Sequence, residues 1–122
     1  MSKRIVVIED NRDILDVVEY ILADQGYEVT GYLDIEPLDK ILANQPCLLL
    51  LDHKLASGSG SDVCLAVKSN PLTSHTSVIL VSASSNIATI AEKCNADGFI
   101  SKPFDLDDLV TMVKEHCETA AH

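Results

Sequence analysis

Residues 47–52 read CLLLLD, a short and fully apolar run that ends on an acid. A strand that is covered by helices on both faces has this composition, because neither of its faces meets water. Three further short runs are apolar, except for Ser101 in the last of them, and each is also followed by a polar residue. They cover residues 5–8 before Glu9 and Asp10, residues 78–81 before Ser82, and residues 99–101 before Lys102. Each run predicts a buried strand with a polar residue at its carboxyl end.

Helical patterns separate these runs. Apolar residues recur at helical spacing within residues 11–25, 61–70, 87–94 and 105–117. That period indicates amphipathic helices, and Asp34 is expected to cap a further short helix that ends before Pro46. Consecutive parallel strands need helical crossovers of one hand. We therefore predict an α/β fold, a doubly wound five-stranded parallel sheet of the flavodoxin-like (βα)5 type.

The strand order decides which polar residues meet. Sheets of this kind commonly have the order 3-2-1-4-5 or 2-1-3-4-5. Residues 27–32 form a polar second strand and residues 98–101 a short fifth strand, and both patterns suit the edges of the sheet. This favours the order 2-1-3-4-5. The switch point then lies between the first and third strands, which brings Glu9 and Asp10 beside Asp52.

Length, composition and charge limit the range of functions. We expect 122 residues to form one domain, residues 1–122 with a core of about 3–118, and 47% apolar residues are enough to fill that core. No apolar run approaches the roughly 18 residues that span a bilayer, and the N-terminus does not resemble a signal peptide. The predicted location is cytoplasmic, without membrane insertion. A net charge of −10 without a basic cluster argues against direct nucleic-acid binding.

The cysteines predict neither a metal site nor a redox pair. Cys47, Cys64, Cys94 and Cys117 are widely spaced and form no C-x-x-C motif. Three of them fall on the apolar side of helical patterns, and Cys47 opens a strand. We therefore interpret all four as small buried hydrophobic residues.

The polar residues at the strand ends predict a phosphoryl-transfer site. Glu9, Asp10 and Asp52 would repel one another unless a cation lies among them, and carboxylate oxygens open to water suit Mg²⁺, or Mn²⁺, better than zinc. Carboxylates can accept phosphoryl groups, so Asp52 is the candidate nucleophile. Lys102 and Ser82 would then neutralise and bind the phosphoryl oxygens.

These motifs together resemble the receiver domain of bacterial two-component response regulators, the chemotaxis-regulator-like fold. The resemblance covers essentially the whole chain. It rests on Glu9-Asp10, on Asp52 with Gly60 following, on Ser82-Ala83, and on Lys102-Pro103-Phe104. Each motif is weak alone, but their order and spacing together are highly specific.

The resemblance implies a role for each of these residues. Asp52 would accept the phosphoryl group from a phosphohistidine, and Ser82 and Lys102 would bind its oxygens. Glu9, Asp10, Asp52 and the backbone carbonyl of Lys54 would hold Mg²⁺. Ser82 would also report phosphorylation, because in the family its hydroxyl moves toward the phosphate. An aromatic residue, here Phe99, then rotates inward and changes the face formed by helix 4, strand 5 and helix 5.

Several positions depart from the common pattern of the family. Glu9 stands where Asp is also common, and its longer side chain could reach the metal through water. Lys54 and Ser84 occupy positions that in the family tune how fast the phosphoryl group hydrolyses. Phe99 lacks the hydroxyl of a tyrosine. None of these departures removes a core residue of the site.

Three other functions are weighed against this one. An aspartate-nucleophile phosphatase usually carries Asp-x-Asp after its first strand, whereas this chain has Glu9-Asp10-Asn11. A flavodoxin-like cofactor carrier would have a phosphate loop rich in Ser, Thr and Gly at that point. A receiver that has lost phosphorylation and serves only for docking would not need the complete set of site residues.

The resemblance also implies partners. The phosphodonor would be a sensor histidine kinase or a histidine phosphotransfer protein, and a downstream protein would read the phosphorylated state. A phosphorylation-dependent dimer is left open, as is the choice between a stand-alone receiver and part of a longer protein such as a hybrid kinase. The domain is not expected to be an enzyme beyond catalysing its own phosphorylation and dephosphorylation.

Overall fold

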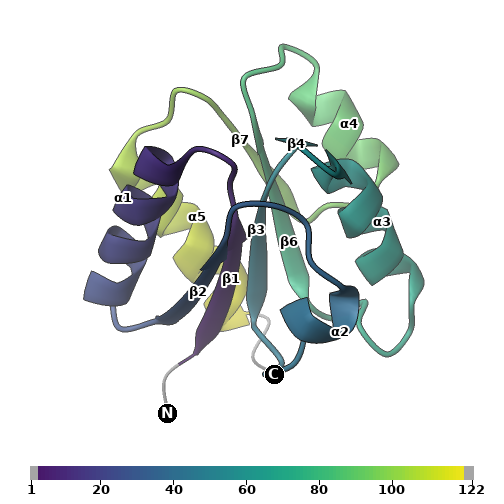
Figure 1. Cartoon of the computed structure of the whole chain (residues 1–122), viewed down its shortest axis with the longest axis horizontal. Coiled ribbons are helices and arrows are strands. Elements are labelled where there is room, and N and C mark those ends of the chain that lie inside the picture. The colour runs from purple at the N-terminus through teal and green to yellow at the C-terminus, as the bar shows by residue number, and fades with distance from the viewer. Residues whose placement is uncertain (1–2, 120–122) are drawn as a thin grey trace.

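The computed structural model contains one central parallel sheet of five strands (Figure 1). It describes residues 3–119, the last two without their side chains, so residues 1–2 and 120–122 of the predicted domain lie outside it. The strands of the sheet are β1 (Arg4–Ile8), β2 (Glu28–Tyr32), β3 (Leu48–Asp52), β6 (Ser77–Ser82) and β7 (Gly98–Ser101). Their order is β2-β1-β3-β6-β7. This confirms the predicted order 2-1-3-4-5, with the polar and the short strand at the two edges.

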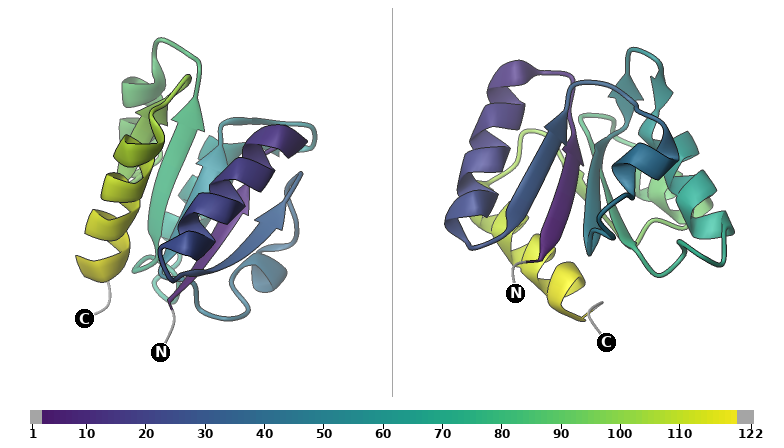
Figure 2. Two further views of the ribbon diagram at one scale, coloured as in Figure 1. Left: turned by 90° about the vertical axis from the view of Figure 1, so that its left-hand side faces the viewer. Right: turned by 60° about the horizontal axis from the view of Figure 1, so that its bottom comes forward.

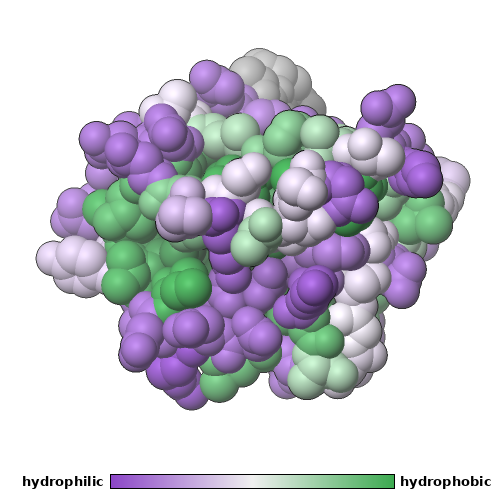
Figure 3. All heavy atoms as spheres, turned by 90° about the horizontal axis from the view of Figure 1, so that it is seen from above, coloured by the Kyte–Doolittle hydropathy of each residue, from purple (hydrophilic) through white to green (hydrophobic). Residues whose placement is uncertain are grey.

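Helices cover both faces of the sheet (Figures 1 and 2). One face carries α1 (Arg12–Asp24) and α5 (Leu106–Thr119). The other face carries α2 (Leu38–Ile41), α3 (Gly60–Ser69) and α4 (Ile87–Lys93). All five strands point the same way, so their carboxyl ends form one edge, the upper one in Figure 1. Figure 3 views this edge from above and shows hydrophilic residues across its middle, with an apolar area to one side.

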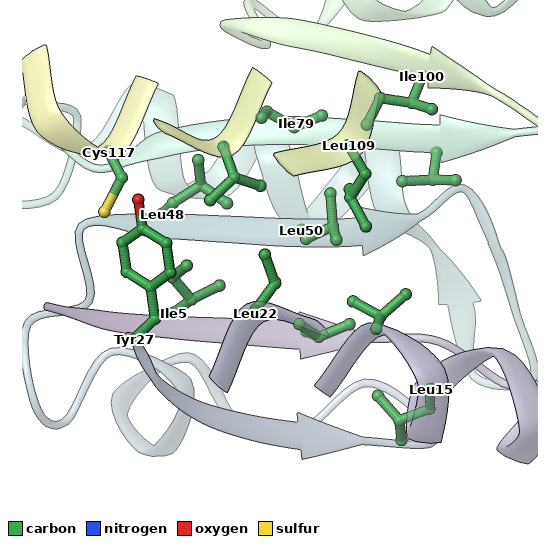
Figure 4. Close-up of a cluster of buried hydrophobic side chains, with 14 residues drawn as sticks. Ile5, Leu15, Leu22, Tyr27, Leu48, Leu50, Ile79, Ile100, Leu109 and Cys117 are labelled. Carbon is green, nitrogen blue, oxygen red and sulfur yellow. The ribbon is translucent and has the colours of Figure 1, made fainter. Parts of the chain in front are cut away.

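Two apolar clusters hold the layers together, one on each face of the sheet. Figure 4 shows the cluster between the sheet and α1 and α5, where Leu22 and Leu109 pack over Leu50. On the opposite face, Leu49 and Leu51 pack against α2, α3 and α4. Successive leucines of β3 therefore enter different clusters, as the alternation of side chains along a strand requires. This explains why the run CLLLLD is apolar at every position before Asp52.

The ends of the first helix follow from local chemistry. The side chain of Asn11 accepts a hydrogen bond from the backbone N–H of Ile14 at 3.1 Å, which satisfies one of the free donors at the helix start. Gly26 follows the helix with φ +97°, a conformation that glycine adopts without strain. α1 is thereby placed directly after Glu9 and Asp10, so its first turn lies beside the carboxyl end of β1.

The region after β2 differs from the sequence-based expectation. Asp34 does not cap α2: its carboxylate accepts hydrogen bonds from the backbone N–H of Ser57, at 3.1 Å, and from the Ser57 hydroxyl. Pro37 explains the difference, because a proline disfavours helical geometry in the residue before it. The helix therefore begins only at Leu38, beyond the reach of Asp34. The contact to Ser57 instead ties the loop after β2 to the loop after β3.

The segment after Asp52 contains a small hairpin. Its strands are β4 (Lys54–Leu55) and β5 (Gly58–Ser59), which pair antiparallel. The Ser59 side chain then caps α3 by accepting from the N–H of Asp62 at 3.2 Å. The hairpin and the cap together fix the backbone on the carboxyl side of Asp52.

Two of the cysteines form a disulfide, which the sequence interpretation did not predict. Cys47, at the foot of β3, is bonded to Cys117 in the last turn of α5, with a Cα–Cα distance of 5.2 Å. Cys64 and Cys94 are free and buried, so the prediction of buried hydrophobic residues is right for this pair and wrong for the other. The pairing joins residues 70 positions apart in the chain, and only the packing of α5 against β3 brings them together.

No helix among residues 3–119 is long and apolar enough to cross a membrane.

Candidate functional site

Three carboxylates meet at the carboxyl edge of the sheet. Glu9 and Asp10 follow β1, and Asp52 is the last residue of the neighbouring strand β3. One oxygen from each carboxylate lies within 4.8 Å of the other two. Glu9 and Asp52 are buried, at 4% and 7% exposure, whereas Asp10 is exposed. The structure thus brings together the three acids that the sequence analysis selected as a cation site.

Lys102 supplies a positive charge directly to this cluster. Its ammonium nitrogen lies 2.8 Å from Oε1 of Glu9 and 3.4 Å from Oδ2 of Asp52. The backbone fixes its position, since the N–H of Lys102 donates to the carbonyl of Ser82 at 2.8 Å. The peptide that follows, Lys102–Pro103, is cis. Lys102 therefore bridges two carboxylates that would otherwise repel one another.

Glu9 is held in place by contacts of both its side chain and its backbone. Its second oxygen accepts a hydrogen bond from the backbone N–H of Asn11 at 3.1 Å. Its own N–H donates to the carbonyl of Tyr32 on β2 at 3.0 Å. The remaining carboxylate oxygen of Glu9 is the one that contacts Lys102, at 2.8 Å. The sequence analysis did not predict this ion pair.

The environment of Asp52 shifts its acidity. Burial raises the pKa of Asp52 to about 7, the negative charge of Glu9 adds to the rise, and the charge of Lys102 opposes it. Burial lowers the pKa of Lys102, but the hydrogen bond to Glu9 and the charge of Asp52 outweigh it and hold that pKa above its ordinary value. A second cation in the site would favour the ionised, nucleophilic form of Asp52.

A shallow crevice of about 380 Å³ opens onto this cluster. Asp10, Asp52, Lys54, Ser82 and Lys102 line it, together with Ala83 and Ser84. Ser82, the last residue of β6, is buried, and its hydroxyl accepts a hydrogen bond from the backbone N–H of Ser84 at 3.0 Å. Every residue that the sequence analysis assigned to phosphoryl or metal binding, except Glu9, therefore lines one crevice, and Glu9 contacts it through Lys102.

The acid cluster fits a magnesium ion by the chemistry of its donors. Mg²⁺ prefers hard oxygen ligands at about 2.1 Å and usually keeps several waters. Three carboxylate oxygens within 4.8 Å of one another, with Asp10 exposed, match that preference. Glu9, Asp10 and Asp52 are the side chains that would hold the ion, and Lys54 borders the same crevice.

Gly60 is required next to the phosphoacceptor candidate. A Cβ at this position would lie 2.4 Å from the backbone carbonyl oxygen of Asp52, closer than any real contact. We expect Gly60→Ala to lower the free energy of unfolding by about 3 kcal/mol, because backbone rather than a side chain must move. Gly58→Ala is the matched control: its Cβ would meet only the end of the Ile35 side chain, at 3.2 Å. Urea unfolding measures both variants, and equal stabilities would contradict this prediction.

Comparison with known proteins agrees with this geometry. Residues 5–114 match the family model of the response regulator receiver domain. The chain belongs to this family. A receiver domain protein (CheY-like) from Methanospirillum hungatei is 29% identical, with 98% of this chain and 97% of that chain covered at a TM-score of 0.88. A putative response regulator from Chloroflexus aurantiacus is 26% identical, with 97% and 99% covered and a TM-score of 0.88. The BeF3-activated DrrB receiver domain is also 26% identical, over 97% and 99%, with a TM-score of 0.80.

The candidate switch residue of this receiver domain lies at the surface. Phe99 on β7 is 38% exposed, although its neighbour Ile100 is buried. It borders a groove between β7 and α5, at the side of the sheet rather than in the phosphoryl crevice. The structure therefore places Phe99 outside the site and shows Ser82 inside it.

An apolar groove of about 540 Å³ adjoins the crevice of the receiver domain. It lies between α1 and the segment that leads from β7 into α5. Its lining comprises Asp13, Ile14, Val17, Val18, Ala83, Lys102, Pro103, Phe104 and Leu106. Ala83 and Lys102 also line the phosphoryl crevice, so the two hollows are neighbours. Val17 and Leu106 expose 48% and 37% of their surface there. The sequence analysis gave neither residue a functional role, because helical periodicity alone does not reveal an exposed apolar pair.

Proposed function

We propose that this receiver domain is the phosphoacceptor of a two-component phosphorelay, and that Asp52 carries the phosphoryl group. The observation that carries the proposal is the position of Asp52: a buried carboxylate between two other acids and 3.4 Å from the ammonium of Lys102. A buried acid in such a cluster, at the mouth of a polar crevice, is typical of a functional site.

In the proposed reaction an ionised oxygen of Asp52 attacks the phosphorus of a phosphohistidine. The new O–P bond forms as the N–P bond breaks, and the electron pair of that bond stays on the imidazole nitrogen. Lys102 and the Ser82 hydroxyl would bind the phosphoryl oxygens, where negative charge is concentrated. Mg²⁺, when bound by Glu9, Asp10 and Asp52, supplies further neutralisation. Attack of water on the phosphorus later returns the free carboxylate, and we propose no other catalytic activity.

The proposed output is a change of the face formed by α4, β7 and α5. When a phosphoryl group occupies the crevice, the hydroxyl of Ser82 would donate a hydrogen bond to one of its oxygens. Ser82 would then lose its present hydrogen bond with the backbone N–H of Ser84. Phe99 would then turn inward from its exposed position. The charge added by phosphorylation would thus shift the equilibrium between two packing arrangements of the domain. The solved structure of the BeF3-activated DrrB receiver domain supports the proposal that a domain of this fold has an activated state.

Substitution of Asp52 tests the phosphoacceptor. Acetyl phosphate with Mg²⁺ should phosphorylate the wild-type domain on a group that is labile to both acid and alkali, as an acyl phosphate is, whereas Asp52→Asn should take up no phosphate. Asp13→Asn is the control, because Asp13 is an acid of the first turn of α1 outside the carboxylate cluster. Radiolabelled phosphate or intact mass gives the readout. Undiminished labelling of Asp52→Asn would contradict the assignment of the nucleophile.

The apolar groove beside the crevice is the proposed docking site of the phosphohistidine protein. The donor must place its phosphoryl group over Asp52, and the groove is an apolar surface that adjoins the crevice and shares Ala83 and Lys102 with it. We expect Val17→Asp to slow transfer from a histidine kinase about tenfold or more, because it puts a charge into a desolvated contact. The donor for this assay is the autophosphorylated kinase, from a panel, that phosphorylates the wild type fastest.

Phosphorylation by acetyl phosphate is the internal control for Val17→Asp. Acetyl phosphate is too small to need the groove, so Val17→Asp should accept phosphate from it at the wild-type rate. Leu65→Asp changes an equally exposed apolar residue, at 44% against 48%, on α3 rather than α1. It should leave both reactions unchanged. Equal slowing by the two variants would refute docking at the groove.

A further inference from the structure

We propose that Asp34 is a positioning residue for the Mg²⁺ site, although it does not line the phosphoryl crevice. Through Ser57 it holds the hairpin of β4 and β5, and the hairpin in turn places the backbone carbonyl of Lys54 where it can bind the metal. This inference rests on the proposed function, because it names a residue that prepares the same site for its cation. Neither Asp34 nor Ser57 belongs to the motifs that carry the family resemblance.

Asp34 holds the turn of the hairpin with both of its carboxylate oxygens. One oxygen accepts a hydrogen bond from the backbone N–H of Ser57 at 3.1 Å, and the other accepts from the Ser57 hydroxyl. The bond from this hydroxyl, followed by those from the N–H groups of Ile35 and Ser57, holds the pKa of Asp34 below its ordinary value. Asp34 is therefore ionised at neutral pH, and its contact with Ser57 is of the stronger, charge-assisted kind.

Apolar side chains join the same two segments. Ile35 and Leu55 are both partly buried and pack against the core cluster on the α2, α3 and α4 face of the sheet. The side chain of Ile35 also approaches Gly58, since a Cβ added there would lie 3.2 Å from its terminal carbon. The hairpin therefore packs on the segment that follows β2, and Asp34 fixes the position of its turn.

The hairpin is so short that its turn determines where Lys54 lies. Its strands form two residue pairs, Lys54 with Ser59 and Leu55 with Gly58. Ser57 lies in the turn between them, three residues after Lys54. Figure 1 shows β4 at the carboxyl edge of the sheet, and Lys54 borders the crevice beside Asp52. A shift of the turn would move both strands, so the contact of Ser57 with Asp34 also fixes the backbone at Lys54.

The segment that carries Asp34 is itself tied to the acid cluster. Two residues before Asp34, the carbonyl of Tyr32 accepts a hydrogen bond from the N–H of Glu9 at 3.0 Å. Asp34 thus connects the backbone beside Glu9 with the hairpin that carries Lys54. An ion held by the acids and by the Lys54 carbonyl needs these two backbones at a fixed separation, because Mg²⁺ demands near-ideal geometry. Residues that orient metal ligands without touching the metal contribute strongly to affinity in this way.

Calorimetric titration with Mg²⁺ tests the role of Asp34. We expect Asp34→Ala and Ser57→Ala each to bind Mg²⁺ about tenfold more weakly than the wild type. The double variant should bind no more weakly than either single variant, because the two residues act through one contact. Ser57→Thr, which keeps the hydroxyl, should retain the wild-type affinity.

Asp39→Ala is the matched control. Asp39 is an acid in the first turn of α2, and its side chain makes no hydrogen bond or ion pair within residues 3–119. The control removes the same charge from a nearby position, and its Mg²⁺ affinity should change less than about twofold because salt screens exposed charges. Amide hydrogen exchange of the metal-free proteins gives an independent readout. Residues 54–59 should exchange faster in Asp34→Ala than in the wild type, and at the wild-type rate in Asp39→Ala.

Unchanged Mg²⁺ affinity in Asp34→Ala would overturn the inference even if the hairpin exchanges faster, because the contact would then be structural only. Equal weakening by Asp34→Ala and Asp39→Ala would also overturn it, as would a double variant in which the two single losses multiply. Labelling by acetyl phosphate is measured on the same samples, and saturating Mg²⁺ should restore the wild-type rate in Asp34→Ala. Intact labelling of the wild type with an unaltered Asp34→Ala refutes this inference alone, whereas absent labelling of the wild type refutes the proposed function instead.

Discussion

Reduction of the Cys47–Cys117 disulfide should lower the free energy of unfolding by about 4 kcal/mol at 25 °C. The bond closes a loop of 70 residues, more than half of the chain. A cross-link of this span stabilises a protein mainly by restricting its unfolded state, and the effect grows slowly with loop length. It also fastens the last turn of α5, where Ser77 donates to the carbonyl of His116 at 3.2 Å. We therefore expect the end of α5 to exchange its amide hydrogens faster after reduction.

Urea unfolding with and without a dithiol reductant measures this effect. Cys47→Ser is the control, since the variant has no bond to reduce and should unfold at the same urea concentration under both conditions. The other two cysteines are free and buried, so they add no second cross-link. Identical unfolding of the oxidised and reduced wild type would contradict the predicted stabilisation.

Removal of the Lys102 ammonium should slow phosphorylation of Asp52 by acetyl phosphate about 10²–10³-fold, the usual cost of losing one charge-stabilising donor. Lys102 is the cation that lies within 3.4 Å of Asp52 and 2.8 Å of Glu9. In Lys102→Ala the ammonium that is paired with Asp52 is lost, and Lys54, which borders the same crevice, has no ion pair to Asp52 among the described residues that could replace it. Phosphate incorporation over time, measured at saturating Mg²⁺, gives the rate.

The same variant should bind Mg²⁺ as tightly as the wild type or more tightly. The ammonium of Lys102 and the metal both neutralise Glu9 and Asp52, so they compete electrostatically. Lys54→Ala is the matched control, because Lys54 borders the same crevice without an ion pair to either acid in the described structure. It should change the rate far less. Weaker Mg²⁺ binding by Lys102→Ala would show that the lysine does not occupy the place described here.

The fold could be predicted because its main signals are local. The run CLLLLD is apolar at each position since the leucines of β3 enter clusters on both faces of the sheet. The polar β2 and the short β7 identified the edges, and the strand order then brought Glu9 and Asp10 beside Asp52. The composition of each strand and the rules of parallel sheets were sufficient for that step.

The features that could not be predicted depend on distances between remote residues. Nothing in the spacing of the cysteines distinguishes the pair Cys47 and Cys117 from Cys64 and Cys94. The pairing follows from where α5 ends against β3. Likewise, Asp34 has the right residue type for a helix cap, and only the three-dimensional approach of Ser57 gives it another partner. The ion pair of Glu9 with Lys102 joins residues that follow β1 and β7, two strands that lie far apart in the sequence, and no local pattern indicates it.

Direct location of the phosphoryl group tests the central claim best. The wild-type domain is incubated with acetyl phosphate and Mg²⁺, reduced with borohydride, which converts an aspartyl phosphate to homoserine, and digested for peptide mass spectrometry. We predict homoserine at position 52 only, and none when Mg²⁺ is removed with a chelator. Homoserine at another aspartate, or none with Mg²⁺ present, would contradict the claim that Asp52 is the phosphoacceptor.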